Sequence, residues 1–201
     1  MCGTRSASNS HVSGKAAGTN GAQADMMGMS STEWSSYMHE VIGLVDPPEE
    51  INAEVVRRMQ ARYAEHLPLM DGAVEVTTRL ARTFRLALAS SSNRPLIDTV
   101  LSSAGLDALF EVAVSSEEVQ RGRPAPDVFL EAARRLGVES GQCVAIEDSA
   151  NGICAAHAAG MRVIAIPNRR YPPPADALAL ADVVLDSLAE LTPAVAVAGA
   201  G

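Results

Sequence analysis

The sequence predicts an α/β fold: a doubly wound parallel sheet of Rossmann type, preceded by a helical cap. Short apolar runs alternate with helical patterns along residues 73–185, and such alternation is typical of parallel sheets with right-handed crossovers. Polar clusters follow two of these runs, near Ser90 and near Glu147, at the strand ends where open α/β sheets bind ligands. Residues 26–70 show helical periodicity without a strand pattern, which indicates a cap that precedes the sheet.

The composition narrows the class of protein. A chain of 201 residues with 47% hydrophobic residues fits one domain, or one domain with a small cap. The net charge of −8 without a basic stripe argues against a nucleic-acid partner. The three cysteines have no metal or disulfide spacing, as is typical of a reducing compartment. No apolar run is long enough for a membrane span or a signal peptide, so we expect a cytoplasmic protein without a membrane partner.

The N-terminal third contains a tail and the cap. Residues 1–25 are small and polar, and we expect them to be disordered. Residues 26–70 form a partial helical cap, in which the Pro47-Pro48 pair separates two amphipathic helices. The polar side of the second helix, at about residues 49–66, carries three arginines, Arg57, Arg58 and Arg62. These arginines form either a solvated face or a lid that touches an anionic substrate.

Residues 71–201 are predicted to form the α/β core. Apolar residues at helical spacing predict its helices, and short runs rich in Val, Ile and Leu predict its strands. Proline near a helix start and serine as an N-cap mark two of the boundaries. We expect helices at about 73–82, 95–103, 128–136 and 149–160, strands at 84–89, 109–114, 143–146, 161–166 and 182–185, a loop at 167–180, a helical turn at 188–191 and a loose tail from residue 192.

A pair of carboxylates, Glu147 and Asp148, directly follows the apolar strand that ends at Ile146. Hard oxygen ligands at the carboxyl end of a strand suit Mg²⁺. A solvated helix start is the alternative, because acidic side chains also favour the positive end of the helix dipole.

A second polar cluster, Ser90-Ser91-Ser92-Asn93, follows the strand that begins near Phe84. Hydroxyl donors, free backbone N–H groups and the helix dipole converge there on an anion, which makes the cluster a candidate phosphate site. An ordinary serine N-cap is the alternative.

Residues 26 to about 191 resemble the haloacid dehalogenase superfamily, and within it the β-phosphoglucomutase-like phosphatases that carry a helical cap. The resemblance rests on Leu88-Ala-Ser-Ser-Ser-Asn93, Gly122-Arg-Pro-Ala-Pro-Asp127 and Glu147-Asp-Ser-Ala-Asn-Gly152, in that order. It implies that Ser90 has a catalytic role and binds phosphate together with Ser91 and Asn93, and that Glu147 and Asp148 bind Mg²⁺. The substrate-specificity loop of the cap falls at Gly28-Met29-Ser30-Ser31.

Two departures from the family pattern matter. Arg123 replaces the lysine of the third motif; it keeps the positive charge and can still neutralise a phosphate, so we retain a catalytic and phosphate-binding role for it. The first motif, Asp-x-Asp-Gly-Thr after an N-terminal strand, is missing, and its first aspartate is the nucleophile in this family. Met70-Asp71-Gly72 is not a substitute, because Leu69 stands at the nucleophile position.

The missing motif belongs to the central strand of the family's sheet. We therefore expect unpaired edges on the strands at 84–89 and 143–146, and a chain that is a truncated or frame-shifted version of a longer one. The resemblance implies a Mg²⁺-dependent phosphatase of a small phosphorylated metabolite that is inactive or impaired as written. The alternatives are a non-catalytic phosphate- and metal-binding or interaction module, and a gene remnant that folds poorly.

Overall fold

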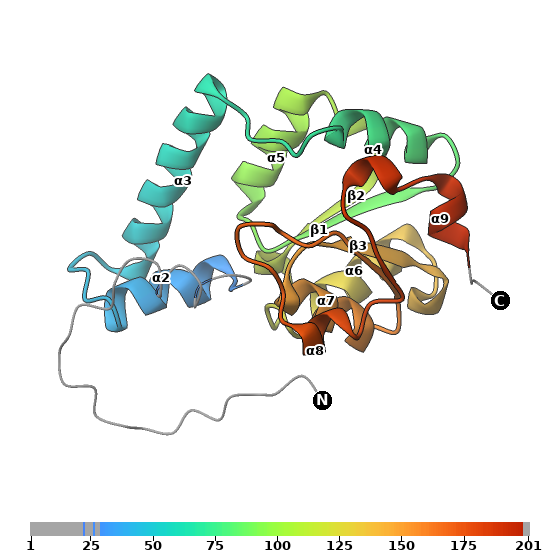
Figure 1. Ribbon diagram of the computed structural model, residues 1–201. Coiled ribbons are helices and arrows are strands. Elements are labelled where there is room, and N and C mark those ends of the chain that lie inside the picture. Colours follow the sequence, from blue (N-terminus) through green and yellow to red (C-terminus); the bar gives the residue numbers. More distant parts are fainter. Residues whose placement is uncertain (1–21, 23–25, 27–28, 199–201) are drawn as a thin grey trace.

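The computed structural model describes residues 22, 26 and 29–198 of the chain. Two helices, α2 (Ser31–Glu40) and α3 (Pro48–Glu65), precede the part of the chain that contains the strands. Figure 1 shows both helices to one side of the α/β part; we refer to these two helices as the cap. The predicted tail of residues 1–25 lies outside the described residues except for Ala22, which is buried.

Local sequence signals set the limits of the cap helices. Ser30 caps α2 through a reciprocal capping box with Glu33, an arrangement that satisfies two otherwise unpaired backbone donors. Pro48 occupies the first position of α3, where the missing N–H of proline costs nothing. Arg57 and Arg58 are exposed and pair with Glu54 on the same helix, as the first of the two alternatives, a solvated face, requires.

All strand pairings are parallel, as predicted, but the strands form two sheets. One sheet joins β1 and β2, and the other has the order β3-β4-β5. The strands are β1 (Leu86–Ser90), β2 (Phe110–Ser115), β3 (Val144–Glu147), β4 (Arg162–Ala165) and β5 (Val183–Val184). Among the residues that the structure describes, no backbone hydrogen bond joins β1 to β3. The two strands therefore keep the unpaired edges that the sequence predicts, and the sheet is split at the expected place.

Helices cover both faces of the sheets, which makes the fold doubly wound (Figure 1). Those of the α/β part with more than five residues are α4 (Ala73–Ala81), α5 (Arg94–Ala104), α6 (Asp127–Leu136) and α7 (Ala150–Ala158). Glycines in the left-handed conformation end two of them, Gly105 after α5 and Gly137 after α6. A residue without a Cβ adopts this conformation without strain, so the chain can reverse direction into the next strand.

The core lies on both sides of the strands. On one face Val114, Ile153 and Val163, which have no exposed surface, pack with α6 and α7. On the other face Val76 and Leu80 of α4 pack with Ile164 and with the C-terminal part of the chain. The helix from 128 and the strand from 143 were each predicted to within one residue, because their apolar periods are continuous. None of the described helices combines the length and the apolar composition needed to cross a membrane.

Two sequence expectations for the C-terminal part were wrong. The tail from residue 192 is not loose, because Thr192 caps a short helix, α9 (Pro193–Val197), and Ala196 of this helix is buried. Arg162 also donates a hydrogen bond to the Ala196 carbonyl at 2.9 Å. The loop at 167–180 likewise contains a helix of four residues, α8 (Ala175–Leu178). Tertiary contacts with β4 and with the core stabilise these two short helices, whose sequences carry only weak helical patterns.

Candidate active site

The structure brings the predicted phosphate and metal residues to one end of the molecule, and Arg123 connects them. Its Nη2 donates to the Ala89 carbonyl of β1 at 3.0 Å, and its Nη1 donates to Oε1 of Glu147, the last residue of β3, at 2.6 Å. Because Ser90 follows Ala89 and Asp148 follows Glu147, one guanidinium connects the two carboxyl ends on which these side chains lie. The sequence motifs predicted that these two strand ends lie close together. The residues around Arg123 in the sequence did not indicate its two hydrogen-bond partners.

Glu147 is held in a nearly closed environment. Its side chain is 7% exposed, and burial raises the pKa of its carboxyl while the Arg123 guanidinium lowers it; the net direction is upward. Its Oε2 lies 3.3 Å from both the Asp148 amide and the Ser149 hydroxyl. A Cβ on Gly152 would overlap Oε2 of this carboxylate, so the carboxylate packs directly on the backbone of α7.

Asp148 is the more accessible carboxylate of the pair. Its Oδ2 accepts a hydrogen bond from Nδ2 of Asn168 at 3.2 Å, and its carbonyl accepts the Asn168 amide. Asn168, in the loop after β4, was not predicted. An amide side chain that orients a candidate metal ligand from the next strand end is a contact that only the tertiary structure reveals.

The donor set of the site fits a magnesium ion. Carboxylate oxygens at a strand end suit Mg²⁺, which keeps several water ligands and needs only one or two protein carboxylates. The described residues contain no cluster of three or more acidic, histidine or cysteine side chains suited to a metal, so the candidate set in this part of the chain is the Glu147–Asp148 pair. One oxygen of Glu147 is already neutralised by Arg123, and Asp148 therefore supplies the more available negative charge.

The serine cluster lies at the start of α5, as predicted. The Ser90 Oγ accepts the Ser92 amide at 3.1 Å, while the Ser91 and Ser92 carbonyls accept the hydroxyls of Ser116 and Ser115. The hydroxyls at the carboxyl end of β2 therefore brace the turn that follows β1. This bracing holds Ser90 and Ser91 at the strand end.

Asn93 is 4% exposed and links the core to the cap. Its Nδ2 donates to Oδ1 of Asn52 on α3 at 2.9 Å and to Oε1 of Glu117 at 2.8 Å. The same Glu117 oxygen accepts the Ser31 hydroxyl at 2.6 Å. The Asn93 amide thus bonds within the protein, and its contribution to phosphate binding stays a prediction. Glu117 was not predicted, because the three donors to its carboxylate, Ser31, Asn93 and the Arg94 amide, lie far from it in the sequence.

The predicted specificity loop of the cap lies against the core where the structure describes it. Ser30 and Ser31 are 8% and 1% exposed, and Met29 is half-buried; Gly28 lies outside the described residues. A Cβ on Gly122 would come 2.6 Å from Oε2 of Glu33 and 3.4 Å from Ser30. The glycine of the third motif therefore permits close approach between core and cap.

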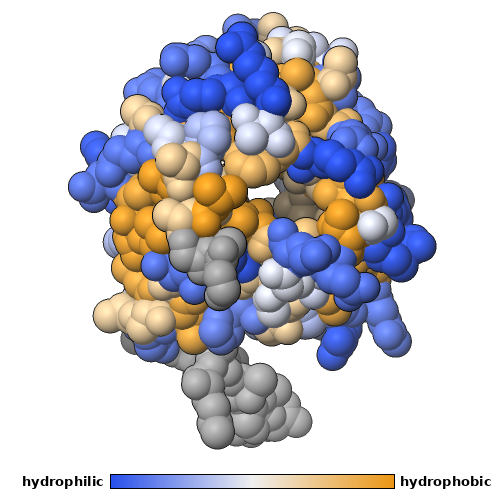
Figure 2. All heavy atoms as spheres, turned by 90° about the vertical axis from the view of Figure 1, so that its right-hand side faces the viewer, coloured by the Kyte–Doolittle hydropathy of each residue, from blue (hydrophilic) through white to orange (hydrophobic). Residues whose placement is uncertain are grey.

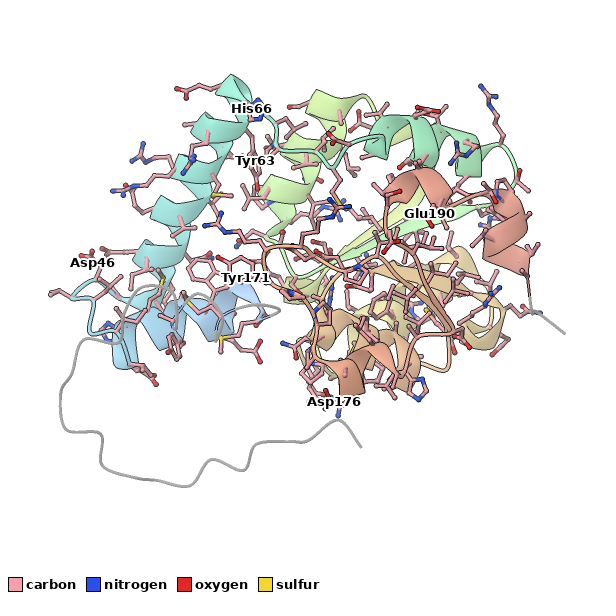
Figure 3. The ribbon with its side chains drawn as sticks, in the orientation of Figure 1. Asp46, Tyr63, His66, Tyr171, Asp176 and Glu190 are labelled. Atoms are coloured by element: carbon pink, nitrogen blue, oxygen red, sulfur yellow. The ribbon has the colours of Figure 1, made fainter. Side chains whose placement is uncertain are left out.

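A pocket of about 230 Å³ lies at the junction of these groups. Arg123, Glu147 and Asp148 supply its charges, and four apolar side chains complete its lining: Met70, Ile146, Ile166 and Leu188. Figure 3 shows Tyr171 extending from the loop after β4 toward the cap, and Tyr63 on the side of α3 that faces the core. Burial raises the pKa of the Tyr63 hydroxyl. The pocket thus combines a cation with two carboxylates, and Arg123 also bonds to Ala89, next to the serine turn that is the candidate anion site.

Curated proteins similar to this chain include several phosphatases. The bifunctional riboflavin kinase/FMN phosphatase of Arabidopsis thaliana is 34% identical over 168 residues, which are 83% of this chain and 44% of that protein. Hexitol phosphatase B of Escherichia coli is 36% identical over 147 residues, 72% of this chain and 65% of that protein. The chain thus spans less than two thirds of the length of these relatives.

Solved structures agree with the sequence matches. CbbY from Rhodobacter sphaeroides, in complex with xylulose-(1,5)bisphosphate, is 27% identical and superimposes with a TM-score of 0.74 over 87% of this chain and 80% of that one. A β-phosphoglucomutase from Clostridium difficile, 20% identical with a TM-score of 0.72 over 86% of this chain and 78% of that one, shares the fold. The family model of the haloacid dehalogenase-like hydrolases matches residues 18–160. The chain belongs to the haloacid dehalogenase-like hydrolase family.

Proposed function

We propose that this chain carries the phosphate- and metal-binding part of a Mg²⁺-dependent phosphatase for small phosphorylated metabolites, and that it is impaired as a catalyst in its present form. The connection of the two strand ends by Arg123 carries the proposal. The relatives support the substrate class, since their names give FMN phosphatase and hexitol phosphatase activities, and CbbY was solved with a sugar bisphosphate.

The roles follow from the chemistry of each group. The hydroxyls of Ser90 and Ser91, together with the N-terminus of α5, would bind the phosphoryl oxygens. Arg123 would neutralise phosphate charge, because a guanidinium binds oxyanions with two parallel donors. Glu147 and Asp148 would hold Mg²⁺, which when bound neutralises the charge of the transferring phosphoryl group. Asn168 would keep Asp148 oriented.

The impairment concerns the nucleophile. In the part of the chain that the structure describes, the pocket contains no carboxylate other than Glu147 and Asp148. Glu147 forms an ion pair with Arg123, and Asp148 is the proposed metal ligand. Asp71 of the Met70-Asp71-Gly72 turn is exposed and does not line the pocket. The family mechanism transfers the phosphoryl group to an aspartate and then to water, and Asp148 is the only aspartate among the described residues that line the pocket.

The test separates binding from turnover. At about ten times their dissociation constant, Mg²⁺ and phosphate together should stabilise the folded chain by about 1.4 kcal/mol. This stabilisation should raise the melting temperature by about 3–6 °C. The Asp148→Ala variant should lose this shift. The chain should show no hydrolysis of p-nitrophenyl phosphate or sugar phosphates above that of Asp148→Ala; turnover that survives stringent purification and is lost in this variant would overturn the impairment.

The second candidate function is a non-catalytic module that binds phosphate and metal. The observation that favours it is a phosphate and metal half-site joined by Arg123, beside a described pocket that contains no carboxylate other than Glu147 and Asp148. Fusing a family-type N-terminal strand to the chain distinguishes the two. A gain of phosphatase activity supports the impaired enzyme, whereas a well-folded fusion that binds Mg²⁺ and phosphate without turnover supports the module.

A further inference from the structure

A phosphorylated metabolite extends beyond the phosphoryl group that the candidate site would hold. The largest cavity described, about 620 Å³ between the two sheets, is one place for the rest of the molecule. Figure 2 shows a hollow on the side of the protein that carries α9, bordered in part by apolar residues. The cavity is lined mostly by apolar side chains, and the arginine in its described lining, Arg85, already pairs with Glu111. A polar metabolite would therefore gain little from entering it.

The loop that follows β4 offers a more polar surface beside the site, and Asn168 anchors it there. The Nδ2 of Asn168 donates to Oδ2 of Asp148 at 3.2 Å, and its backbone amide donates to the Asp148 carbonyl at 3.2 Å. The Oδ1 of the same side chain accepts the amides of Arg170 and Tyr171 at 3.0 and 3.3 Å. One asparagine therefore bonds both to the candidate metal ligand and to the turn that carries Arg170, as asparagine side chains often do in turns.

The turn is also held at its far end. Three prolines, Pro172-Pro173-Pro174, follow it, and Pro173 is buried. Each proline ring fixes its own φ near about −65°, so the backbone has little freedom between the turn and the core. A turn that is fixed at both ends loses little conformational entropy when a ligand binds to it.

Two exposed arginines on this turn lack a counter-charge. In the part of the chain that the structure describes, neither Arg169 nor Arg170 forms an ion pair. Most of the described arginines do pair with a carboxylate, as Arg121 does with Asp127. In a chain with a net charge of −8, two adjacent unpaired cations make this edge of the site locally positive, and such a field attracts an anionic ligand.

Arg170 is the better placed of the two arginines. Its guanidinium carbon lies over the Tyr171 ring, 5.5 Å from the ring centroid, which is a cation–π distance. Figure 3 shows Tyr171 extending from the loop toward the cap, so the guanidinium beside this ring lies next to the space between loop and cap. The N–H donors of a guanidinium lie in its plane and form a fork that matches phosphate and carboxylate oxygens.

A small molecule can reach both the site and Arg170. Two peptide units separate Arg170 from Asn168, so their Cα atoms are at most roughly 7 Å apart, and the Asn168 side chain itself contacts Asp148. A metabolite with a phosphoryl group at one end and a second anionic group at the other spans a distance of this order. The positive surface is only two residues wide, which does not suit a nucleic acid, because nucleic acids need an extended basic surface.

We propose that Arg170, held over Tyr171, binds a second anionic group of the substrate, a phosphate or a carboxylate distal to the transferred phosphoryl group. The inference rests on the proposed function, because it takes the phosphate and metal half-site as the place where the first group binds. It narrows the substrate class to phosphorylated metabolites that carry two anionic groups. It also assigns a specificity-determining residue to the core, outside the cap loop at residues 28–31.

Calorimetric titration of the full chain in the presence of Mg²⁺ tests the proposal with two probes, fructose 1-phosphate and fructose 1,6-bisphosphate. The second probe carries one more phosphate. It should bind about tenfold more tightly than the first, because a hydrogen bond to a charged group contributes at about this level. Arg170→Ala should abolish this difference and leave the affinity for fructose 1-phosphate unchanged.

The chain offers a matched control for the loss of charge. Arg82 is also exposed and has no ion pair among the described residues, but it lies before β1, at the opposite ends of the strands from the site. Arg82→Ala should leave both affinities unchanged. Tyr171→Phe keeps the ring and should keep the tenfold difference, whereas Tyr171→Ala should weaken only the binding of the bisphosphate. Melting curves check that each variant folds, and Arg170→Gln repeats the test if the alanine variant does not.

The outcomes separate this proposal from the proposed function. If inorganic phosphate with Mg²⁺ still raises the melting temperature, equal affinities of the unaltered chain for the two sugars would overturn the role of Arg170 alone. Equal weakening of both sugars by Arg170→Ala would do the same, and so would loss of the tenfold difference in Arg82→Ala, since a general charge effect would then explain it. No stabilisation by inorganic phosphate with Mg²⁺, together with no binding of either sugar, would refute the proposed function and this inference with it.

Discussion

Arg123 and Glu147, twenty-four residues apart, form a buried ion pair whose Nη1–Oε1 distance is 2.6 Å, with side chains 10% and 7% exposed. A buried pair of this kind offsets its own desolvation only when both partners are present and hydrogen-bonded. Here the pair also connects β1 to the end of β3 through the Ala89 carbonyl. The two sheets, which share no backbone hydrogen bond in the described structure, are thus joined at this end by one side chain.

Removing the arginine should therefore destabilise the fold. We expect Arg123→Ala to lower the free energy of unfolding by about 3–5 kcal/mol, because it leaves the Glu147 carboxylate buried without a counter-charge. Arg123→Lys should lose less, since it keeps the charge. Urea unfolding measures both. Arg121→Ala, which breaks an ion pair with Asp127 whose arginine is 66% exposed, is the matched control and should change little; an equal loss in the two alanine variants would contradict the structural role of the pair.

Gly152 should be intolerant of a side chain for a reason that lies in the site. A Cβ there overlaps Oε2 of Glu147, so Gly152→Ala should cost about 1–3 kcal/mol and reduce the stabilisation by Mg²⁺. Gly141→Ala is the control, because its Cβ would meet no atom closer than 3.9 Å. Thermal melts with and without Mg²⁺ measure both the loss of stability and the loss of stabilisation by the metal. A Gly152→Ala variant as stable as Gly141→Ala would refute the packing argument.

The contact of Glu117 with Ser31 should couple the cap to the core. The hydroxyl donates to a carboxylate oxygen at 2.6 Å, and Ser31 is 1% exposed. A double-mutant cycle with Ser31→Ala and Glu117→Gln should give a coupling energy of about 1 kcal/mol. The single variants should also speed amide exchange in α2 while leaving α7 unchanged. A coupling energy near zero would mean that Asn93 and the remaining contacts hold the cap without this bond.

The Mg²⁺ effect should depend on pH through Glu147. Burial raises the pKa of this carboxyl above its usual value near 4.5, so the folded chain takes up the proton more readily than the unfolded chain. The proton then competes with the metal as the pH falls through the raised pKa. The rise in melting temperature caused by Mg²⁺ should therefore become smaller as the pH falls from 7.5. Glu147→Gln removes this titration, and a Mg²⁺ effect that does not change with pH would contradict the prediction.

Much of the fold was predictable from local patterns. The apolar run before Glu147 and the amphipathic period of 128–136 predict a strand and a helix almost to the residue, because each signal is contained in the segment itself. The motifs around Ser90, Arg123 and Glu147 also predicted which strand ends meet. The short helices α8 and α9 were missed, because contacts distant in sequence, such as that of Arg162 with the Ala196 carbonyl, stabilise them.

The sequence by itself determined the parallel α/β class and the family, and it supplied the candidate residues of the site, since these depend on periodicity and on motifs that are read along the chain. Tertiary structure alone decided that Arg123 joins β1 to Glu147, that Asn93 bonds to Asn52 of α3, that Glu117 and Asn168 orient their neighbours, and that a cavity of about 620 Å³ lies between the two sheets. These features depend on which side chains and strand edges come to face each other in space, and the order of residues along the chain does not specify those distances.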